Sequence, residues 1–287
     1  MSSSRGNNLD VAPVSQTVET HGEPPTISSL QDLTIVEAWD LDTNSSKYIT
    51  FYLVTAEEVV YFGESTKNKK DMTLEEYSSA LKLVPDSEIY PETPKDVQLT
   101  LAPESLAEDT AYFKRPGLTS YETLRDTGYV PKAVLDETLI MEQISKSPHA
   151  NIVGYYGCRV RRCRITAIVL ERLDQTLEQR ASTSGVQDLD HDRLLAELES
   201  AVDHLHSLGL AHNDIKPENI MIRNGVPVLI DFGSCQPFGK PLQSLGTDGW
   251  CEEVFFTSER KHDLYSLAKL RDWLHTQNSK GDSGEMQ

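Results

Sequence analysis

Residues 212–219 read HNDIKPEN, and the triplet DFG follows at residues 231–233. Between these motifs, Asn224-Gly225 separates the short apolar runs 220–222 and 226–230. An Asn-Gly pair between apolar runs is typical of a two-residue hairpin turn, because both residues tolerate a positive φ angle. Counting outward from such a turn sets the register of the hairpin. The sequence therefore predicts a hairpin in which position 219 pairs with position 230, next to position 231.

Asn219 and Asp231 would bring an amide oxygen and a carboxylate oxygen to the open end of this hairpin. Oxygen ligands of this kind suit a hard cation such as Mg²⁺, which binds few protein oxygens and keeps water and phosphate oxygens as its other ligands. Asp214 and Lys216 lie just before, on the loop that leaves a helix predicted between Asp190 and Gly209. The segment is thus a candidate site for metal-assisted phosphate chemistry.

The two motifs resemble the signature of eukaryotic-type serine/threonine protein kinases, H-R-D-L-K-x-x-N followed by D-F-G. The resemblance implies that Asp214 accepts or orients the proton of the attacking hydroxyl and that Lys216 holds the γ-phosphate. It implies that Asn219 and Asp231 bind Mg²⁺. The expected activity is the Mg-ATP-dependent transfer of the γ-phosphate to serine or threonine hydroxyls, with ATP and a protein substrate as partners.

Segments upstream fit the same resemblance. A helix is predicted to start near Pro131, and it carries Glu137 before the sequence PHANIV at residues 148–153, which resembles the family's passage from helix C to its fourth strand. The resemblance makes Glu137 the carboxylate that pairs with a phosphate-binding lysine. The short run AYFK ends in Lys114, which is our candidate for that lysine; the alternative is an exposed lysine at a strand end.

The apolar run 165–170 and the residues after it resemble the family's fifth strand and hinge. By this resemblance Leu170 is the gatekeeper, and backbone groups of Glu171 and Leu173 pair with adenine. The alternative is an ordinary buried strand that ends in charged residues.

Several departures from the family pattern leave the function open. Asn213 replaces the arginine that receives a phosphorylated loop in many kinases, so we expect Asn213→Arg to change little. No G-x-G-x-x-G precedes Lys114, since Gly63 is the only glycine between Gly22 and Gly117. Two alternatives to a protein kinase therefore stay open: a small-molecule kinase of the choline or aminoglycoside type, and a nucleotide-binding pseudokinase that acts as an interaction module.

The expected fold is α+β, a two-lobed protein kinase-like fold with a small β-rich N-lobe and a helical C-lobe truncated after helix F. We expect a disordered leader over residues 1–32 and an N-lobe with extra β elements over 33–172. A short C-lobe over 173–276 should end in a helix over about 263–275, in which Asp263 has a structural role, and a disordered tail should follow over 277–287.

Composition excludes several classes of partner. The chain of 287 residues has a formal charge of −18, which disfavours binding to nucleic acid or an anionic membrane. No apolar run is long enough for a signal peptide or a membrane span, so we expect an intracellular protein, cytoplasmic or nuclear. The four cysteines are expected to be free thiols. We expect His204, His206 and four arginines between positions 159 and 164 to be solvated surface residues.

Overall fold

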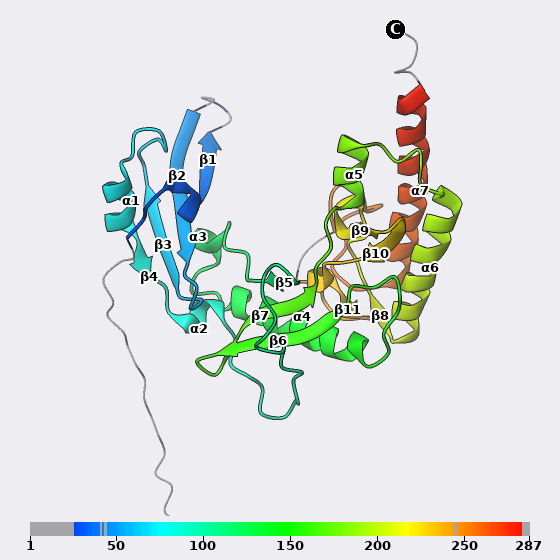
Figure 1. Ribbon diagram of the computed structural model, residues 1–287, viewed down its shortest axis with the longest axis horizontal. Coiled ribbons are helices and arrows are strands. Elements are labelled where there is room, and N and C mark those ends of the chain that lie inside the picture. The colour runs from blue at the N-terminus through cyan, green and yellow to red at the C-terminus, as the bar shows by residue number, and fades with distance from the viewer. Residues whose placement is uncertain (1–25, 41, 43–44, 244–245, 283–287) are drawn as a thin grey trace, which may run out of the picture.

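The computed structural model describes residues 26–282 apart from 41, 43–44 and 244–245. Three parts follow one another along the chain: an N-terminal sheet, a central part with a second sheet and a long helix, and a mainly helical C-terminal part (Figure 1). The structure is therefore α+β, with the strands concentrated in the first two parts and the longest helices in the last.

The N-terminal sheet is antiparallel with the strand order β1-β2-β3-β4. Its elements are the 3₁₀ helix η1 (Leu30–Asp32), β1 (Thr34–Asp40), β2 (Ser45–Val54), β3 (Val60–Ser65), α1 (Leu74–Ala80), β4 (Lys82–Leu83) and α2 (Asp86–Ile89). Alternate residues of β2 face opposite sides: Phe51 packs against Tyr77 of α1, while Tyr52 packs in the cluster that includes Tyr121. The sheet is thus covered on both faces.

The part of the chain in which extra β elements were expected does contain strands. They are β1, β2 and β3, and α1 begins with a capping box formed by Thr73 and Glu76. The strands form a sheet of their own and do not extend the sheet that carries Lys114. Residues 1–25 of the predicted leader lie outside the described residues, whereas Ile27 is buried against this sheet.

The central part contains the second sheet, with strand order β5-β7-β6, and the helix that packs on it. Its elements are β5 (Ala111–Lys114), α3 (Tyr121–Leu124), α4 (Tyr129–Ser145), β6 (Tyr155–Arg161) and β7 (Arg164–Glu171). Pro131 lies in the first turn of α4, where a missing backbone N–H costs nothing. Because β5 pairs only with β7 among the described strands, it forms an edge of this sheet.

The C-terminal part is built around helix α6, which runs alongside α7 (Figure 1). Its elements are α5 (Leu177–Thr183), α6 (His191–Ser207), β8 (Leu210–Ala211), η2 (Pro217–Asn219), β9 (Ile220–Arg223), β10 (Val226–Leu229), η3 (Phe232–Ser234), β11 (Gln236–Pro237) and α7 (Arg260–Asp282). Leu198 and Leu205 of α6 share one core with Leu270 and Leu274 of α7. The last helix starts three residues before the predicted start and continues past the predicted end near residue 275.

The four arginines of the β6–β7 hairpin connect the central part to acidic residues upstream. Each forms an ion pair: Arg159 with Glu58, Arg161 with Glu104, Arg162 with Asp86 and Arg164 with Glu92. The prediction of a solvated hairpin tip is wrong for Arg159 and Arg164, whose side chains are 21% and 20% exposed. The hairpin tip is instead a joint between two parts of the molecule.

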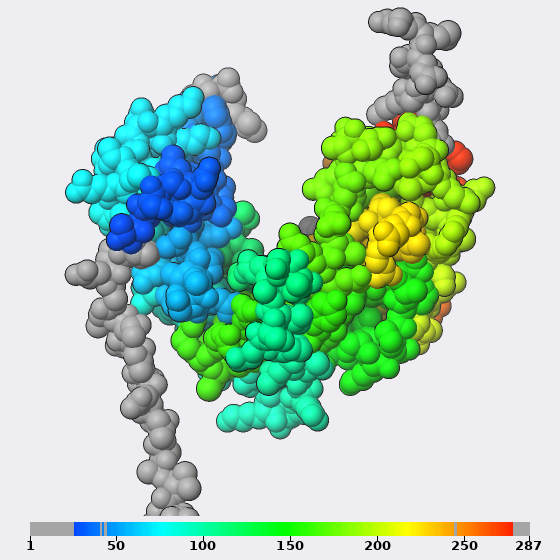
Figure 2. Space-filling model, in the orientation of Figure 1, coloured from blue at the N-terminus to red at the C-terminus, as the bar shows by residue number. Residues whose placement is uncertain are grey.

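Figure 2 shows a hollow between the N-terminal sheet and the helical C-terminal part, with residues of the central part at its base. This arrangement leaves the middle of the molecule accessible from the side of the hollow. Within the described ranges, no helix combines the length and apolarity that a membrane span needs.

Candidate active site

Asp263, near the start of α7, fixes the loop that carries HNDIKPEN. Its fully buried carboxylate accepts hydrogen bonds from the backbone amides of His212 and Asn213, at 2.9 and 2.8 Å, and lies 2.9 Å from Nε2 of His206. Burying a carboxylate is costly unless it is hydrogen-bonded, so these donors stabilise it. The prediction that His206 is a surface residue is wrong, because this side of α6 faces Asp263 and His206 is only 4% exposed.

Asn213 occupies the position at which the kinase pattern has arginine. It is 3% exposed and adopts a left-handed backbone conformation with φ of 64°. Its side-chain nitrogen donates to the carbonyls of Ala211 and Ser234, at 2.8 and 3.0 Å, and to the Ser258 hydroxyl at 3.0 Å. An arginine would lose these hydrogen bonds, so the structure gives Asn213 a larger role than the sequence indicated.

Asp214, Lys216 and Asn219 lie within hydrogen-bond distance of one another. The Lys216 ammonium and the Asn219 amide nitrogen both donate to Oδ2 of Asp214, at 2.8 and 2.9 Å. Thr247 completes the cluster, because its hydroxyl donates to Oδ1 of Asp214 at 2.7 Å and accepts from Lys216 at 2.6 Å. The contact between Thr247 and Asp214 was not predicted from the sequence.

The hairpin after this loop has the predicted register. Val226 pairs with Arg223 and Leu229 with Ile220, and the Ile230 amide donates to the Asn219 carbonyl at 3.0 Å. Asp231 follows with a left-handed backbone, φ 59°, and Oδ1 of its side chain accepts from the Gly233 amide at 3.3 Å. The hairpin therefore brings the chain at Asp231 back beside the loop that carries Asp214.

Lys114 lies between Glu137, its predicted carboxylate partner, and Asp231, which was predicted as a metal ligand. Its ammonium is 2.6 Å from Oε1 of Glu137 on α4 and 2.7 Å from Oδ1 of Asp231. Burial alone would lower the pKa of Lys114, but the two carboxylates raise it above its ordinary value. Burial would likewise raise the pKa of Asp231, but the Lys114 charge and hydrogen bond lower it overall. The lysine is thus a cation and Asp231 a carboxylate at neutral pH.

The donor set at the hairpin end fits a magnesium ion bound together with phosphates. Lys114 and the Gly233 amide both engage Oδ1 of Asp231, and Asn219 uses its amide nitrogen toward Asp214. Within the described ranges no three His, Cys, Asp or Glu side chains gather as a metal cluster. A cation here would therefore depend on phosphate oxygens for part of its coordination, which is the usual situation for Mg²⁺.

A cavity of about 300 Å³ lies beside this cluster, between the second sheet and the β9–β10 hairpin. Leu170, the predicted gatekeeper, lines it together with Glu171 and Leu173, the two residues predicted to pair with adenine, and with Lys114 and Asp231. The backbone amide of Glu171 already donates a hydrogen bond to the Gly154 carbonyl at 2.8 Å. The backbone group of Glu171 that could pair with adenine is therefore its carbonyl. Sequence reasoning assigned no binding role to the other lining residues, which include Tyr112, Gln179, Met221 and Ile230.

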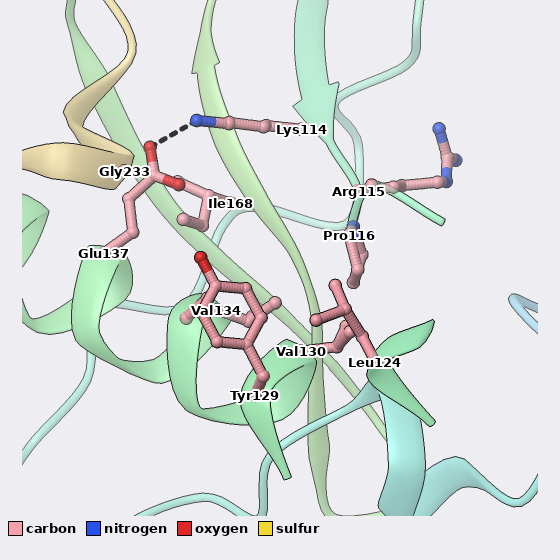
Figure 3. Close-up of a pocket in the computed structure, with 12 residues that line it drawn as sticks. Lys114, Arg115, Pro116, Leu124, Tyr129, Val130, Val134, Glu137, Ile168 and Gly233 are labelled. Atoms are coloured by element: carbon pink, nitrogen blue, oxygen red, sulfur yellow. Dashed lines mark hydrogen bonds and ion pairs between the residues drawn. The ribbon is translucent and has the colours of Figure 1, made fainter. Parts of the chain in front are cut away.

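A second, smaller cavity of about 170 Å³ lies on the other side of Lys114. In Figure 3, Lys114 reaches Glu137 across this space, and Tyr129, Val130 and Val134 of α4 line it. Its walls come from the end of β5 and the first turns of α4. The position of α4 therefore decides whether Glu137 can reach the lysine.

Comparison with known proteins identifies the class to which this fold and site belong. The family model for the protein kinase domain matches residues 119–268, more than half of the chain, so the chain belongs to the protein kinase family. The match begins after β5 and includes Glu137 and every predicted site residue downstream of it; Lys114 lies before it.

Individual relatives are kinases by name. The chain is 35% identical to a Wee1-like protein kinase of Arabidopsis thaliana over 126 residues, and this aligned region covers 42% of this chain and 25% of the relative. It is 34% identical over 117 residues to human serine/threonine-protein kinase/endoribonuclease IRE2, covering 36% and 12%. It is 30% identical over 160 residues to MAP kinase kinase kinase SSK2 of Saccharomyces cerevisiae, covering 50% and 9%. The chain thus spans a quarter or less of the length of these relatives.

Proposed function

We propose that this chain transfers the γ-phosphate of Mg-ATP to serine or threonine hydroxyls of a protein substrate. One observation carries the proposal: two clusters of charged and polar side chains, Lys114–Glu137–Asp231 and Asp214–Lys216–Asn219, flank the same hairpin end beside a cavity of about 300 Å³. Phosphoryl transfer depends mainly on positioning and charge neutralisation, and these clusters offer both.

Each cluster has a separate task in this proposal. Asp214 is oriented by Thr247 and Lys216, so its carboxylate can take the proton of an acceptor hydroxyl. Lys216 carries a positive charge next to that carboxylate and can stabilise a transferring phosphate group. Lys114, held by Glu137, is placed to bind phosphate oxygens, while Asp231 and Asn219 are the candidate metal ligands. Bound Mg-ATP would supply the phosphoryl group and the cation that neutralises its charge.

The nucleotide base would occupy the 300 Å³ cavity, against Leu170 as gatekeeper and the backbone of Glu171 and Leu173. Residues 33–172 would act as an enlarged N-lobe and residues 173–276 as the C-lobe. Because the chain before Lys114 has no glycine-rich loop, we expect weaker nucleotide binding than a covered phosphate site would give.

The test combines binding and transfer. Thermal shift with Mg-ATP and transfer from labelled ATP to casein or histone are measured for the parent, Lys114→Ala and Asp231→Asn. Both variants should reduce transfer by about 10²–10³-fold. The control Lys132→Ala, on the same helix as Glu137 but in an exposed pair with Asp136, should retain parental activity.

The competing functions give different results in the same experiment. Transfer to small alcohols such as choline but not to proteins would indicate a small-molecule kinase. A Mg-ATP thermal shift without transfer to any acceptor would indicate a nucleotide-binding interaction module. Parental activity in Asp231→Asn would refute the metal assignment.

A further inference from the structure

Glu58 is a buried carboxylate on the N-terminal sheet, in the turn that joins β2 to β3. Its side chain is 1% exposed, and Oε1 lies 3.3 Å from Nη1 of Arg159 and 3.8 Å from Nε of Arg115. Its other oxygen, Oε2, is buried with no hydrogen-bond partner in the described part of the chain. Burying a carboxylate is unfavourable unless charged partners compensate, and the two arginines provide that compensation for Glu58.

The backbone of the turn does not explain why a glutamate stands at this position. Glu58 adopts a left-handed conformation with φ of 63°, and the turn is closed by hydrogen bonds of 2.9 Å between Thr55 and Val59 and between Glu58 and Thr55. Glycine or asparagine adopts this conformation at lower cost. The feature that glutamate adds is therefore its carboxylate, which reaches out of the N-terminal sheet.

The arginines that Glu58 binds lie against the strand that carries Lys114. The Arg159 guanidinium lies 4.0 Å from the ring centroid of Phe113, and Arg115 directly follows Lys114 in the chain. Successive side chains of a strand point to opposite faces, so Phe113 and Lys114 lie on opposite sides of β5. Glu58 and Arg159 thus support the face of β5 that is turned away from the candidate site.

This support matters because β5 is short and lies at a sheet edge. It has four residues and pairs only with β7 among the described strands. A strand with one neighbour has half the ladder contacts of a central strand, so its position depends more on side-chain contacts. The turn itself is held against the β6–β7 hairpin, since Arg162 donates to the carbonyls of Glu57 and Glu58 at 2.8 and 3.1 Å.

We propose that Glu58 is a positioning residue for Lys114: through Arg159 and Arg115, it holds β5 so that the lysine meets Glu137 and Asp231. The N-terminal sheet thereby acts as a brace for the phosphate-binding lysine. The proposal rests on the proposed function in one respect only, namely that Lys114 binds the phosphates of Mg-ATP.

The test uses Glu58→Gln, which keeps the shape of the side chain and removes its charge. Hydrogen–deuterium exchange of the segment 109–116 is measured without nucleotide, and the Kd of Mg-ATP is measured by calorimetry. The exchange of β5 should become about 5- to 30-fold faster, and the Kd should rise by about the same factor. Glu58→Asp, which keeps the charge on a shorter side chain, should give intermediate values.

Two controls separate positioning from general stability. Exchange within β2, residues 46–54, should stay at the parental rate if Glu58 acts on β5 alone. A purely structural defect would instead accelerate exchange throughout the N-terminal sheet. Glu104→Gln removes the ion-pair partner of Arg161, which lies on the same β6–β7 hairpin as Arg159. The Glu104 side chain is 87% exposed, and its change should leave both readouts unchanged. If Glu58→Gln does not fold, Arg159→Met, which keeps an apolar stem over Phe113, replaces it.

Parental exchange in β5 and a parental Kd in Glu58→Gln would overturn the proposal, as would equal acceleration in β2 and β5. If the parent protein itself does not bind Mg-ATP, the proposed function fails, while the exchange of β5 still decides whether Glu58 positions the strand.

Discussion

Replacing Asn213 with alanine tests how the HNDIKPEN loop is held. The Asn213 side chain connects this loop to Ser234, just after DFG, and to Ser258, just before α7. Alanine removes these connections without adding bulk. We expect Asn213→Ala to destabilise the protein and to lower activity together with stability, since three segments around the candidate site lose a common partner.

The magnitude follows from the geometry. Three acceptors surround the Asn213 nitrogen, but an amide has only two N–H groups, so two hydrogen bonds at about 1 kcal/mol each is a fair count. Forcing alanine into the left-handed conformation at φ 64° adds about 1 kcal/mol. The free energy of unfolding should therefore fall by about 3 kcal/mol, which corresponds to roughly 6–12 °C in Tm for a chain of this size.

Asn224→Ala is the matched control. Asn224 also has a left-handed backbone, φ 53°, but it is exposed at the tip of the β9–β10 hairpin. Its replacement should cost only the backbone term of about 1 kcal/mol. Urea unfolding gives the loss in free energy of unfolding for each variant, and the difference between the two losses is the contribution of the Asn213 side-chain hydrogen bonds. If Asn213→Ala costs no more than Asn224→Ala, the assigned hydrogen bonds contribute nothing and the reasoning fails.

Three further outcomes can be measured. Arg162→Ala should lower the free energy of unfolding by about 1–2 kcal/mol in urea, because Arg162 binds Asp86 with two nitrogens in a partly buried setting; a change below about 0.3 kcal/mol would mean that solvent screens the pair fully. Thr247→Val should reduce phosphate transfer about ten- to hundredfold while leaving the Kd of Mg-ATP unchanged, since only the orientation of the acceptor-side carboxylate is lost; equal losses in both would contradict this role. Burial raises the pKa of Cys158 to about 11, so iodoacetamide at pH 8 should label exposed Cys163 first. The contribution of the protonated Cys158 thiol to the free energy of unfolding is fully present below about pH 9 and is lost as the pH rises toward 11. Faster labelling of Cys158 would contradict its burial.

The parts of the site that depend on local turn geometry could be predicted from the sequence. The Asn-Gly turn sets the hairpin register, and the register sets which residue pairs with Asn219. Helix α4 could be located from Pro131 and its apolar spacing, and α1 from its capping box. In each case the determining residues lie within a few positions of one another, where sequence spacing translates directly into distance.

Contacts between distant segments could not be predicted in this way. His206 looked like a polar residue on the exposed side of a helix, and only the packing of α7 shows that Asp263 lies against it. Thr247 lies 33 positions from Asp214, so nothing in local spacing marks it as a partner of that carboxylate. The burial of Arg159 and Arg164 was not predicted for the same reason, since Arg159 contacts Glu58 101 positions upstream and Arg164 contacts Glu92 72 positions upstream.

These two kinds of contact imply different origins for the two halves of the candidate site. Asp214, Asn219 and Asp231 lie on one short loop and hairpin, so their arrangement follows from a stretch of about 20 residues that the whole protein kinase family shares in pattern. Lys114 lies before the part that the family model matches, on a short edge strand whose outer face is supported by the N-terminal sheet. On our proposal for Glu58, its distance from Asp231 depends on the contacts that Arg159 makes with Glu58 and Phe113, two residues that also lie before the matched part. A change in the N-terminal sheet should accordingly alter nucleotide binding before it alters the acceptor side of the site.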